Sequence, residues 1–160
     1  MNVWLMKTFQ DWAQRFMDGD SPYVALDEPG VDLNYGELSE AKKSKLFKDL
    51  DASSEKKRRW GLIRKFFDRF YKNVEVGDVL VLGTGRTTKF HVYAIVEIVS
   101  DAYYVDSPTS NDSRHRRDVK ILWMDEPFLV EEWGWARRLE ILDTTDRLKE
   151  FINVYTKLNK

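Results

Sequence analysis

The stretch GDVLVLGTGRTTKFHVYAIVEIVSDAYYVD, residues 77–106, decides the fold. Two apolar runs flank a short polar segment that contains Gly83 and Gly85. Apolar runs bounded by turn residues are typical of β-strands. A dinucleotide-binding loop needs a third glycine where Thr88 stands, followed by a helix, and no spacing here matches a P-loop. We therefore predict that GTGRTTK, residues 83–89, is the connection of a β-hairpin.

Further strands and helices are expected on both sides of this hairpin. Strands are predicted within residues 2–9, 21–30 and 118–130, and a short strand or turn within 131–143. A helix is predicted over 11–19, with Asp11 as N-cap and Gly19 at its end, and two helical pieces over 38–74. A C-terminal helix is predicted over 144–158, capped by Thr145 or Asp146.

Composition limits the classes of function. The chain of 160 residues has no cysteine, which excludes disulfides, thiolate metal sites and a cysteine nucleophile. Its two histidines disfavour a His-rich metal site, so we expect no metal and no cofactor. A net charge of -1 excludes a wholly basic surface but allows a local basic face. Neither a membrane span nor a signal peptide is visible, so an intracellular, cytoplasmic protein of one domain is expected.

The order of the segments carries a resemblance to a known family. A first strand ending in WLMKTF is followed later by VEVGDVLVLGTG, by a return strand VYAIVEIVSDAYYVD and by VKILWM. This order resembles the EVE-type domains of the PUA-like superfamily, which include the YTH relatives. Within that group, the chain is most similar to the N-terminal DNA-recognition domain of archaeal McrB-type, modification-dependent restriction proteins. The resemblance extends roughly from Val3 to Asp143 and implies an α+β fold, a PUA-like curved β-barrel flanked by helices. We expect residues 1–160 to form a single domain of this kind, the N-terminal part of a larger protein.

The same resemblance implies a pocket for one base that has been flipped out of a nucleic acid. The Lys-Ser pair of the YTH branch corresponds to Lys7 and Thr8 here, and its cage aromatics correspond to Tyr23 and to Tyr103 or Tyr104. Polar side chains could read the base edge and further aromatics could line the pocket. These candidates are Thr8, Gln10, Asp27, Trp12, Trp133 and Trp135. For the tryptophans, the alternative is ordinary core packing, which we expect more strongly for Trp60 and Trp123.

Basic residues are the candidates for phosphate contacts, because such contacts provide most non-specific affinity for nucleic acids. The segment NDSRHRRD, residues 111–118, is expected to be a polar loop, which equally allows a solvated loop without function. The phosphate-binding candidates are Arg86, Lys89, Arg114, His115, Arg116 and Arg117.

The sequence thus predicts a binding domain without catalytic activity that recognises modified duplex DNA by base flipping. The resemblance implies an AAA+ GTPase and a nuclease subunit as fused or associated partners in a McrBC-like restriction complex. One alternative is an RNA-binding EVE or YTH-like reader. The other, weaker alternative is a metal-dependent nuclease, because Asp118 and Lys120 match the end of a D-x-K motif and Asp101 or Asp106 could add a carboxylate.

Overall fold

The computed structural model describes residues 1–19, 23–53, 58–86, 88–106 and 114–160. They form two compact units. Unit 1 comprises Met1–Pro22, Glu75–Val99 and Val119–Lys160, and unit 2 comprises Tyr23–Val74 and Ser100–Asp118. The chain therefore crosses between the units four times, once within a single long strand, β6 (His115–Leu129).

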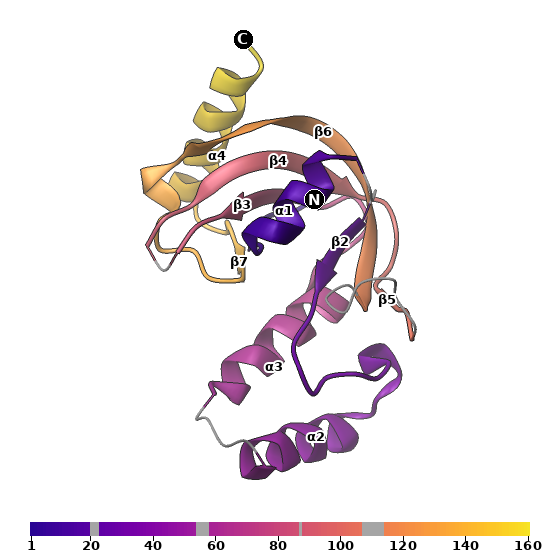
Figure 1. Cartoon of the computed structure of the whole chain (residues 1–160). Coiled ribbons are helices and arrows are strands. Elements are labelled where there is room, and N and C mark those ends of the chain that lie inside the picture. Colours follow the sequence, from indigo (N-terminus) through magenta and orange to yellow (C-terminus); the bar gives the residue numbers. More distant parts are fainter. Residues whose placement is uncertain (20–22, 54–57, 87, 107–113) are drawn as a thin grey trace. The chain divides into compact units, whose positions relative to one another are not determined.

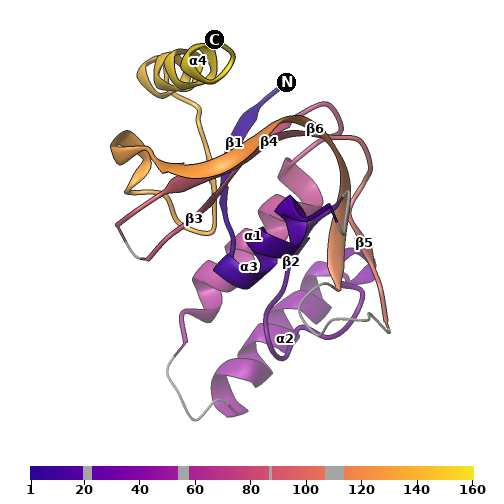
Figure 2. The ribbon, with the colours of Figure 1, turned by 45° about the horizontal axis from the view of Figure 1, so that its top comes forward.

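Unit 1 is built on a mixed sheet. The parallel pair β1 (Val3–Lys7) and β3 (Val79–Thr84) lies at its centre, with β7 (Leu139–Ile141) antiparallel to β1. On the other side, β4 (His91–Ile98) is antiparallel to β3 and to the later residues of β6. Figure 1 shows β3, β4 and β6 as curved neighbouring strands. The helix α1 (Gln10–Met17) and the helix α4 (Thr145–Leu158) lie on opposite sides of this sheet in both Figure 1 and Figure 2.

The two faces of this sheet are covered differently. One face packs with the short helix η3 (Glu131–Trp133) and with part of α4. The buried cluster on that face consists of Val3, Leu5, Val79, Val81, Phe90, Val92, Ile95, Val130, Trp133, Ala136 and Leu142. On the α1 face, Phe16 meets the ring of the buried Tyr93 edge to face. The alternating apolar residues of these strands are therefore buried on both faces of the sheet.

The predicted hairpin is confirmed, and each of its glycines has its own reason. β3 and β4 pair antiparallel, and the N–H of Lys89 donates to the carbonyl of Arg86 within the turn. Gly85 has a φ of 138°, in the region that favours glycine. Gly83 has an ordinary φ, but a Cβ there would lie 2.3 Å from the buried ring of Phe90. In this Gly-x-Gly, Gly85 therefore serves the turn and Gly83 serves the close packing against Phe90.

Unit 2 is largely helical and aromatic. It contains β2 (Tyr23–Leu26), η1 (Tyr35–Glu37), α2 (Glu40–Ser53), α3 (Trp60–Asp68), the π-helical turn η2 (Arg69–Asn73) and β5 (Tyr103–Tyr104). β2 and β5 pair antiparallel with the first residues of β6. Rings from η1, α2 and α3 contact one another at the centre, including Tyr35, Phe47, Trp60 and Phe67.

Three boundaries differ from the sequence-based expectations. The first helix begins at Gln10, so Phe9 and not Asp11 occupies the N-cap position. At the last helix, the cap is Thr144, whose Oγ1 accepts from the N–H of Arg147 at 3.3 Å. Residues 115–117 were expected in a loop but belong to β6, because β2 and β5 supply the strand partners that a sequence cannot show. Residues 111–113 of the same expected loop lie outside the described residues.

Candidate functional site

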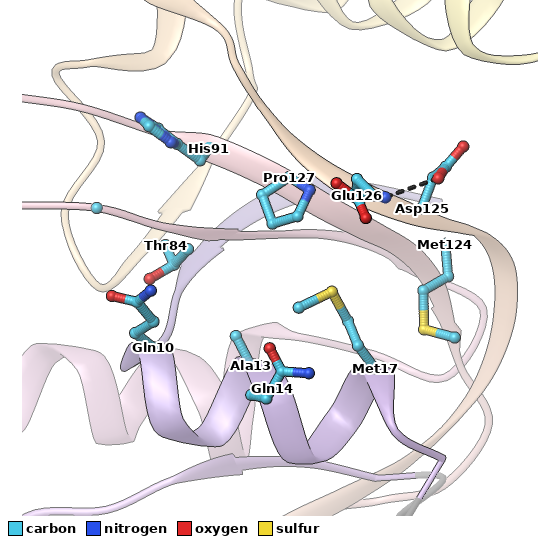
Figure 3. Close-up of a pocket in the computed structure, with 11 residues that line it drawn as sticks. Gln10, Ala13, Gln14, Met17, Thr84, His91, Met124, Asp125, Glu126 and Pro127 are labelled. Atoms are coloured by element: carbon cyan, nitrogen blue, oxygen red, sulfur yellow. Dashed lines mark hydrogen bonds between the residues drawn. The ribbon is translucent and has the colours of Figure 1, made fainter.

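Unit 1 contains a pocket of about 670 Å³ between α1, the end of β3 and the outer part of β6. Figure 3 shows Met17 and Met124 extending toward this space from α1 and β6. The lining residues are Gln10, Ala13, Gln14, Met17, Thr84, Gly85, His91, Met124, Asp125, Glu126 and Pro127. This volume is within the range of pockets that bind small organic ligands.

The lining combines apolar surface with hydrogen-bonding groups. Ala13, Met17 and Met124 supply apolar surface, and methionine sulfur makes favourable contacts with flat rings. Gln10 supplies an amide that can both donate and accept, and Glu126 supplies an acceptor. A pocket with these groups suits a flat, polar-edged ring such as a nucleobase.

Two predicted phosphate-binding residues lie beside this pocket. Arg86 and Lys89 are exposed in the hairpin whose first residues, Thr84 and Gly85, line the pocket. The pocket lining itself carries two carboxylates on β6, those of Asp125 and Glu126, and Gln10 at the start of α1 also belongs to the predicted set. The structure therefore brings Gln10 and this hairpin together in one region of unit 1.

The other predicted pocket residues of unit 1 have different environments. Lys7 is half-buried at the end of β1, and burial lowers the pKa of its ammonium group. The hydroxyls of Thr8 and Tyr93 are hydrogen-bonded at 2.7 Å. Trp135 is 38% exposed, and the guanidinium of Arg147 lies over its ring at 3.9 Å.

Trp12 and Trp133 are core residues, which was the alternative interpretation of the sequence. Trp12 is buried and stacks on Phe16 at 5.4 Å between ring centroids. Trp133 is fully buried and packs edge to face against Phe90. Neither ring offers a free face to a base in this structure, because both are covered by apolar neighbours.

In unit 2, the strand register collects three predicted residues on one face of the small sheet. Arg116 lies opposite Ala25 of β2 and Tyr103 of β5, and Tyr23 lies opposite Asp118. The guanidinium of Arg116 lies 4.2 Å from the centroid of the Tyr23 ring. Tyr103 donates to Asp118 Oδ1 at 2.6 Å. Burial and this carboxylate raise the pKa of Tyr103 to about 12. Tyr23, Tyr103 and Arg116 thus form a partly exposed surface of two rings and one guanidinium, with the carboxylate of Asp118 on the same face.

The intervening residues of β6 point the other way, which corrects their predicted role. His115 is fully buried, with Nε2 2.7 Å from the carbonyl of Val31 and Nδ1 2.6 Å from the hydroxyl of Tyr71. Arg117 is 2% exposed, and its guanidinium donates to the backbone carbonyls of unit 2. Its three acceptors are Phe70, Val74 and Ser100. Both side chains hold unit 2 together and are not exposed for phosphate contacts.

The three remaining candidates lie close to His115 or along the adjoining chain. The ring of Tyr104 lies 5.1 Å from the ring of His115. Arg114 is partly exposed, and the neighbouring hydroxyl of Tyr104 and carboxylate of Asp32 raise its pKa. Asp27 is half-buried immediately after β2. Of these three residues, Tyr104 packs against the buried imidazole.

Neither a metal centre nor a membrane span appears in the part of the chain that the structure describes. No three His, Asp or Glu side chains of the described residues gather in a way that could hold a metal ion. Asp118, from the D-x-K pattern, is occupied by the Tyr103 hydroxyl. Within the described ranges, the helices are too short or too polar to cross a bilayer.

Comparisons with known proteins identify the family and the fold. A model of the family described as a domain of unknown function (DUF8426) matches residues 25–144, so the chain belongs to this family. No curated protein matches the chain.

Similar solved structures share the fold at low sequence identity. The crystal structure of the Mmi1 YTH domain has a TM-score of 0.51 at 15% identity, covering 100% of both chains. A complex of the YTH domain-containing protein Mmi1 with RNA has a TM-score of 0.50 at 13% identity, covering 99% of this chain and 87% of that one. A hypothetical protein from Leishmania major has a TM-score of 0.50 at 10% identity, covering 100% and 98%. The predicted PUA-like α+β fold class is confirmed.

Most of the pocket lining was not among the predicted site residues. The helical spacing of the α1 residues could have predicted that they share one face of the helix. These residues are Gln10, Ala13, Gln14 and Met17. The approach of residues 124–127 was not readable, because it depends on the register of β6 against β4.

Proposed function

We propose that this chain is a nucleic-acid reader that holds one displaced base in the pocket of unit 1. The observation that carries the proposal is the composition of the pocket: apolar side chains from two elements, an amide and a carboxylate, next to an exposed hairpin with Arg86 and Lys89. The base would lie between Met17 and Met124. The amide of Gln10 and the carboxylate of Glu126 would meet its polar edge.

The energetics of such a site are feasible. Displacing a base from a duplex costs a few kcal/mol. In the pocket, contacts with Met17 and Met124 and hydrogen bonds of about 0.5–1.5 kcal/mol each would offset this cost. Phosphate contacts add salt-dependent affinity, and stacking of a further base on an aromatic side chain returns about 1–3 kcal/mol. In unit 2, the surface of Tyr23, Tyr103 and Arg116 offers such stacking and charge. We propose it as a second contact region.

The proposal is one of binding without catalysis. Its finer form, taken from the sequence resemblance, is recognition of a modified base in duplex DNA for a McrBC-like restriction complex with an AAA+ GTPase and a nuclease. The fold shared with YTH domains supports a reader, and an Mmi1 structure was solved as an RNA complex. RNA binding is therefore the second candidate function.

Fluorescence anisotropy at fixed, moderate salt tests the proposal. The ligands are three versions of one DNA duplex and the matching single-stranded RNA. The first duplex is unmodified, the second carries N6-methyladenine and the third carries 5-methylcytosine. Preference for a modified duplex supports the DNA form, and preference for RNA over DNA of the same sequence supports the second candidate, because the 2′-hydroxyl distinguishes them.

Variants connect the binding to the pocket. We expect Gln10→Ala and Glu126→Ala to weaken binding at least 5-fold, because both remove hydrogen bonds to the base edge, about 1 kcal/mol or more each. Glu132→Ala, which removes an exposed carboxylate outside the pocket, is the matched control. Absence of binding by the wild-type chain refutes the reader function. Binding that is unchanged in both pocket variants refutes the pocket assignment.

A further inference from the structure

Phe9 is an exposed aromatic residue next to the pocket helix. It is 70% exposed and occupies the N-cap position of α1, directly before the pocket residue Gln10. An isolated exposed apolar side chain is common in proteins and indicates nothing by itself. Phe9 differs because a cation lies over its ring: the guanidinium of Arg138 is 5.8 Å from the ring centroid.

Further basic residues belong to the two chain segments that carry this pair. The N–H of Lys7 donates to the carbonyl of Arg138 at 2.9 Å, so the end of β1 and the segment before β7 are adjacent. Arg137 is exposed on the same segment, and Lys7 is half-buried. The nearby carboxylate of Asp11 is exposed to solvent. The segments that adjoin Phe9 therefore carry three basic residues, Lys7, Arg137 and Arg138, and two acidic residues, Asp11 and Glu140.

We propose that Phe9 and Arg138 form a stacking platform for the base next to the one held in the pocket. This inference rests on the proposed reader function and adds residues that bind the flanking nucleotide. The exposed ring presents a flat π-face, which every base can use without sequence preference. The guanidinium of Arg138 adds cation–π contact, and the cations of this region attract the adjoining phosphate.

Because Phe9 directly precedes the pocket residue Gln10, the base that stacks on Phe9 would be the neighbour of the base in the pocket. Their Cα atoms are about 3.8 Å apart, as in any trans peptide. A strand whose base enters beside Gln10 therefore passes close to Phe9. The platform would hold the strand while the pocket reads one base, so it would serve ligands of two or more nucleotides and not a mononucleotide.

The test compares hexanucleotides with mononucleotides. Hexamers of adenine or cytosine, as DNA and as RNA, and the matching mononucleotides are titrated against the wild-type chain and Phe9→Ala. We expect Phe9→Ala to weaken the hexamer about 5- to 150-fold, which corresponds to about 1–3 kcal/mol per stacked base, and to leave the mononucleotide within about 2-fold. Phe9→Trp should restore hexamer binding. Ile152→Ala, at an exposed apolar position of α4, is the control.

A spectroscopic measurement reports the stacking directly. 2-Aminopurine placed at each position of the hexamer in turn should be quenched in one position by the wild-type chain and not by Phe9→Ala. Equal hexamer affinity in wild type and Phe9→Ala overturns the platform, and equal losses for hexamer and mononucleotide overturn it as well. If the wild-type chain binds no nucleotide at all, the reader function itself fails.

Discussion

Arg116 and Arg117 are neighbours in β6, but their side chains lie on opposite faces of the small sheet in unit 2. Arg116 is partly exposed over the ring of Tyr23, whereas Arg117 is 2% exposed and donates to three backbone carbonyls. The reason is the two-residue period of a strand, which turns successive side chains to opposite faces. Two residues with the same charge therefore have different expected roles.

Arg116→Ala should weaken nucleic-acid binding with little effect on stability. We expect a similar loss of affinity for every sequence tested and a salt dependence that is lower by about one phosphate contact. The measurement is anisotropy at several salt concentrations, with thermal unfolding in parallel. A salt dependence equal to that of the wild-type chain would exclude Arg116 from the interface.

Arg117→Met should destabilise the fold instead. The change leaves the carbonyls of Phe70, Val74 and Ser100 without their donor, and each buried acceptor left unsatisfied costs about 1–3 kcal/mol. We expect a loss of roughly 3 kcal/mol or more in urea unfolding. Arg117→Lys should recover only part of it, because one ammonium cannot reproduce the guanidinium fork. A wild-type midpoint for Arg117→Met would contradict this role.

Stability should fall as the pH decreases below about 6.5, the ordinary pKa of histidine. Burial lowers the pKa of His115 in the folded chain, with a smaller lowering by Arg114, and this outweighs the raising effects of the Val31 carbonyl and the Asp32 carboxylate. The unfolded chain therefore binds a proton at a higher pH than the folded chain. The stabilisation is complete above the unfolded pKa and is lost as the pH falls toward the lower folded pKa.

Urea unfolding between pH 5 and 8 measures this effect. One histidine gives a maximal slope of about 1.4 kcal/mol per pH unit. His115→Gln should flatten the dependence in this range, and His91→Gln is the control that retains His115. If the pH dependence of stability remains in His115→Gln but disappears in His91→Gln, it arises from His91 and this prediction is wrong.

Asp118→Asn should lower the pKa of Tyr103 toward its ordinary value of about 10, because the carboxylate that opposes ionisation is removed. The wild-type chain should lose stability as the pH rises from about 10, the unfolded pKa, to about 12. Ultraviolet titration of the tyrosines follows the change.

The same variant tests the nuclease alternative. If the wild-type chain cleaves nucleic acid in the presence of Mg²⁺ and Asp118→Asn does not, the nuclease function replaces the reader function.

Gly83→Ala should destabilise unit 1 although its φ is not positive. The added Cβ would meet the ring of Phe90 at 2.3 Å in a fully buried layer. Overpacking of this kind costs about 1–3 kcal/mol. Thermal unfolding should show a lower midpoint, and Phe90→Leu in the same chain should recover part of the loss. An unchanged midpoint in the single variant would show that the ring moves aside freely.

The sequence alone predicted the elements whose pattern is local. The β3–β4 hairpin, the opening strand, the two-part helical region and the C-terminal helix each follow from apolar spacing and turn residues within a single segment. The fold class followed as well, through the order of these segments. The capping positions were off by one or two residues: the first helix begins after Phe9, which makes no side-chain cap, and Thr144 takes the cap of the last helix in place of its neighbour Thr145.

Only the tertiary structure decided which side chains meet. Trp12 and Trp133 could be pocket or core from sequence, and packing against Phe16 and Phe90 placed them in the core. The role of Arg117 depended on strand partners from β2 and β5, and the pocket depended on β6 reaching α1. Local spacing determines which face a residue shares with its neighbours in an element. What that face then contacts is set by non-local pairing, which the alternation of residues along one strand does not contain.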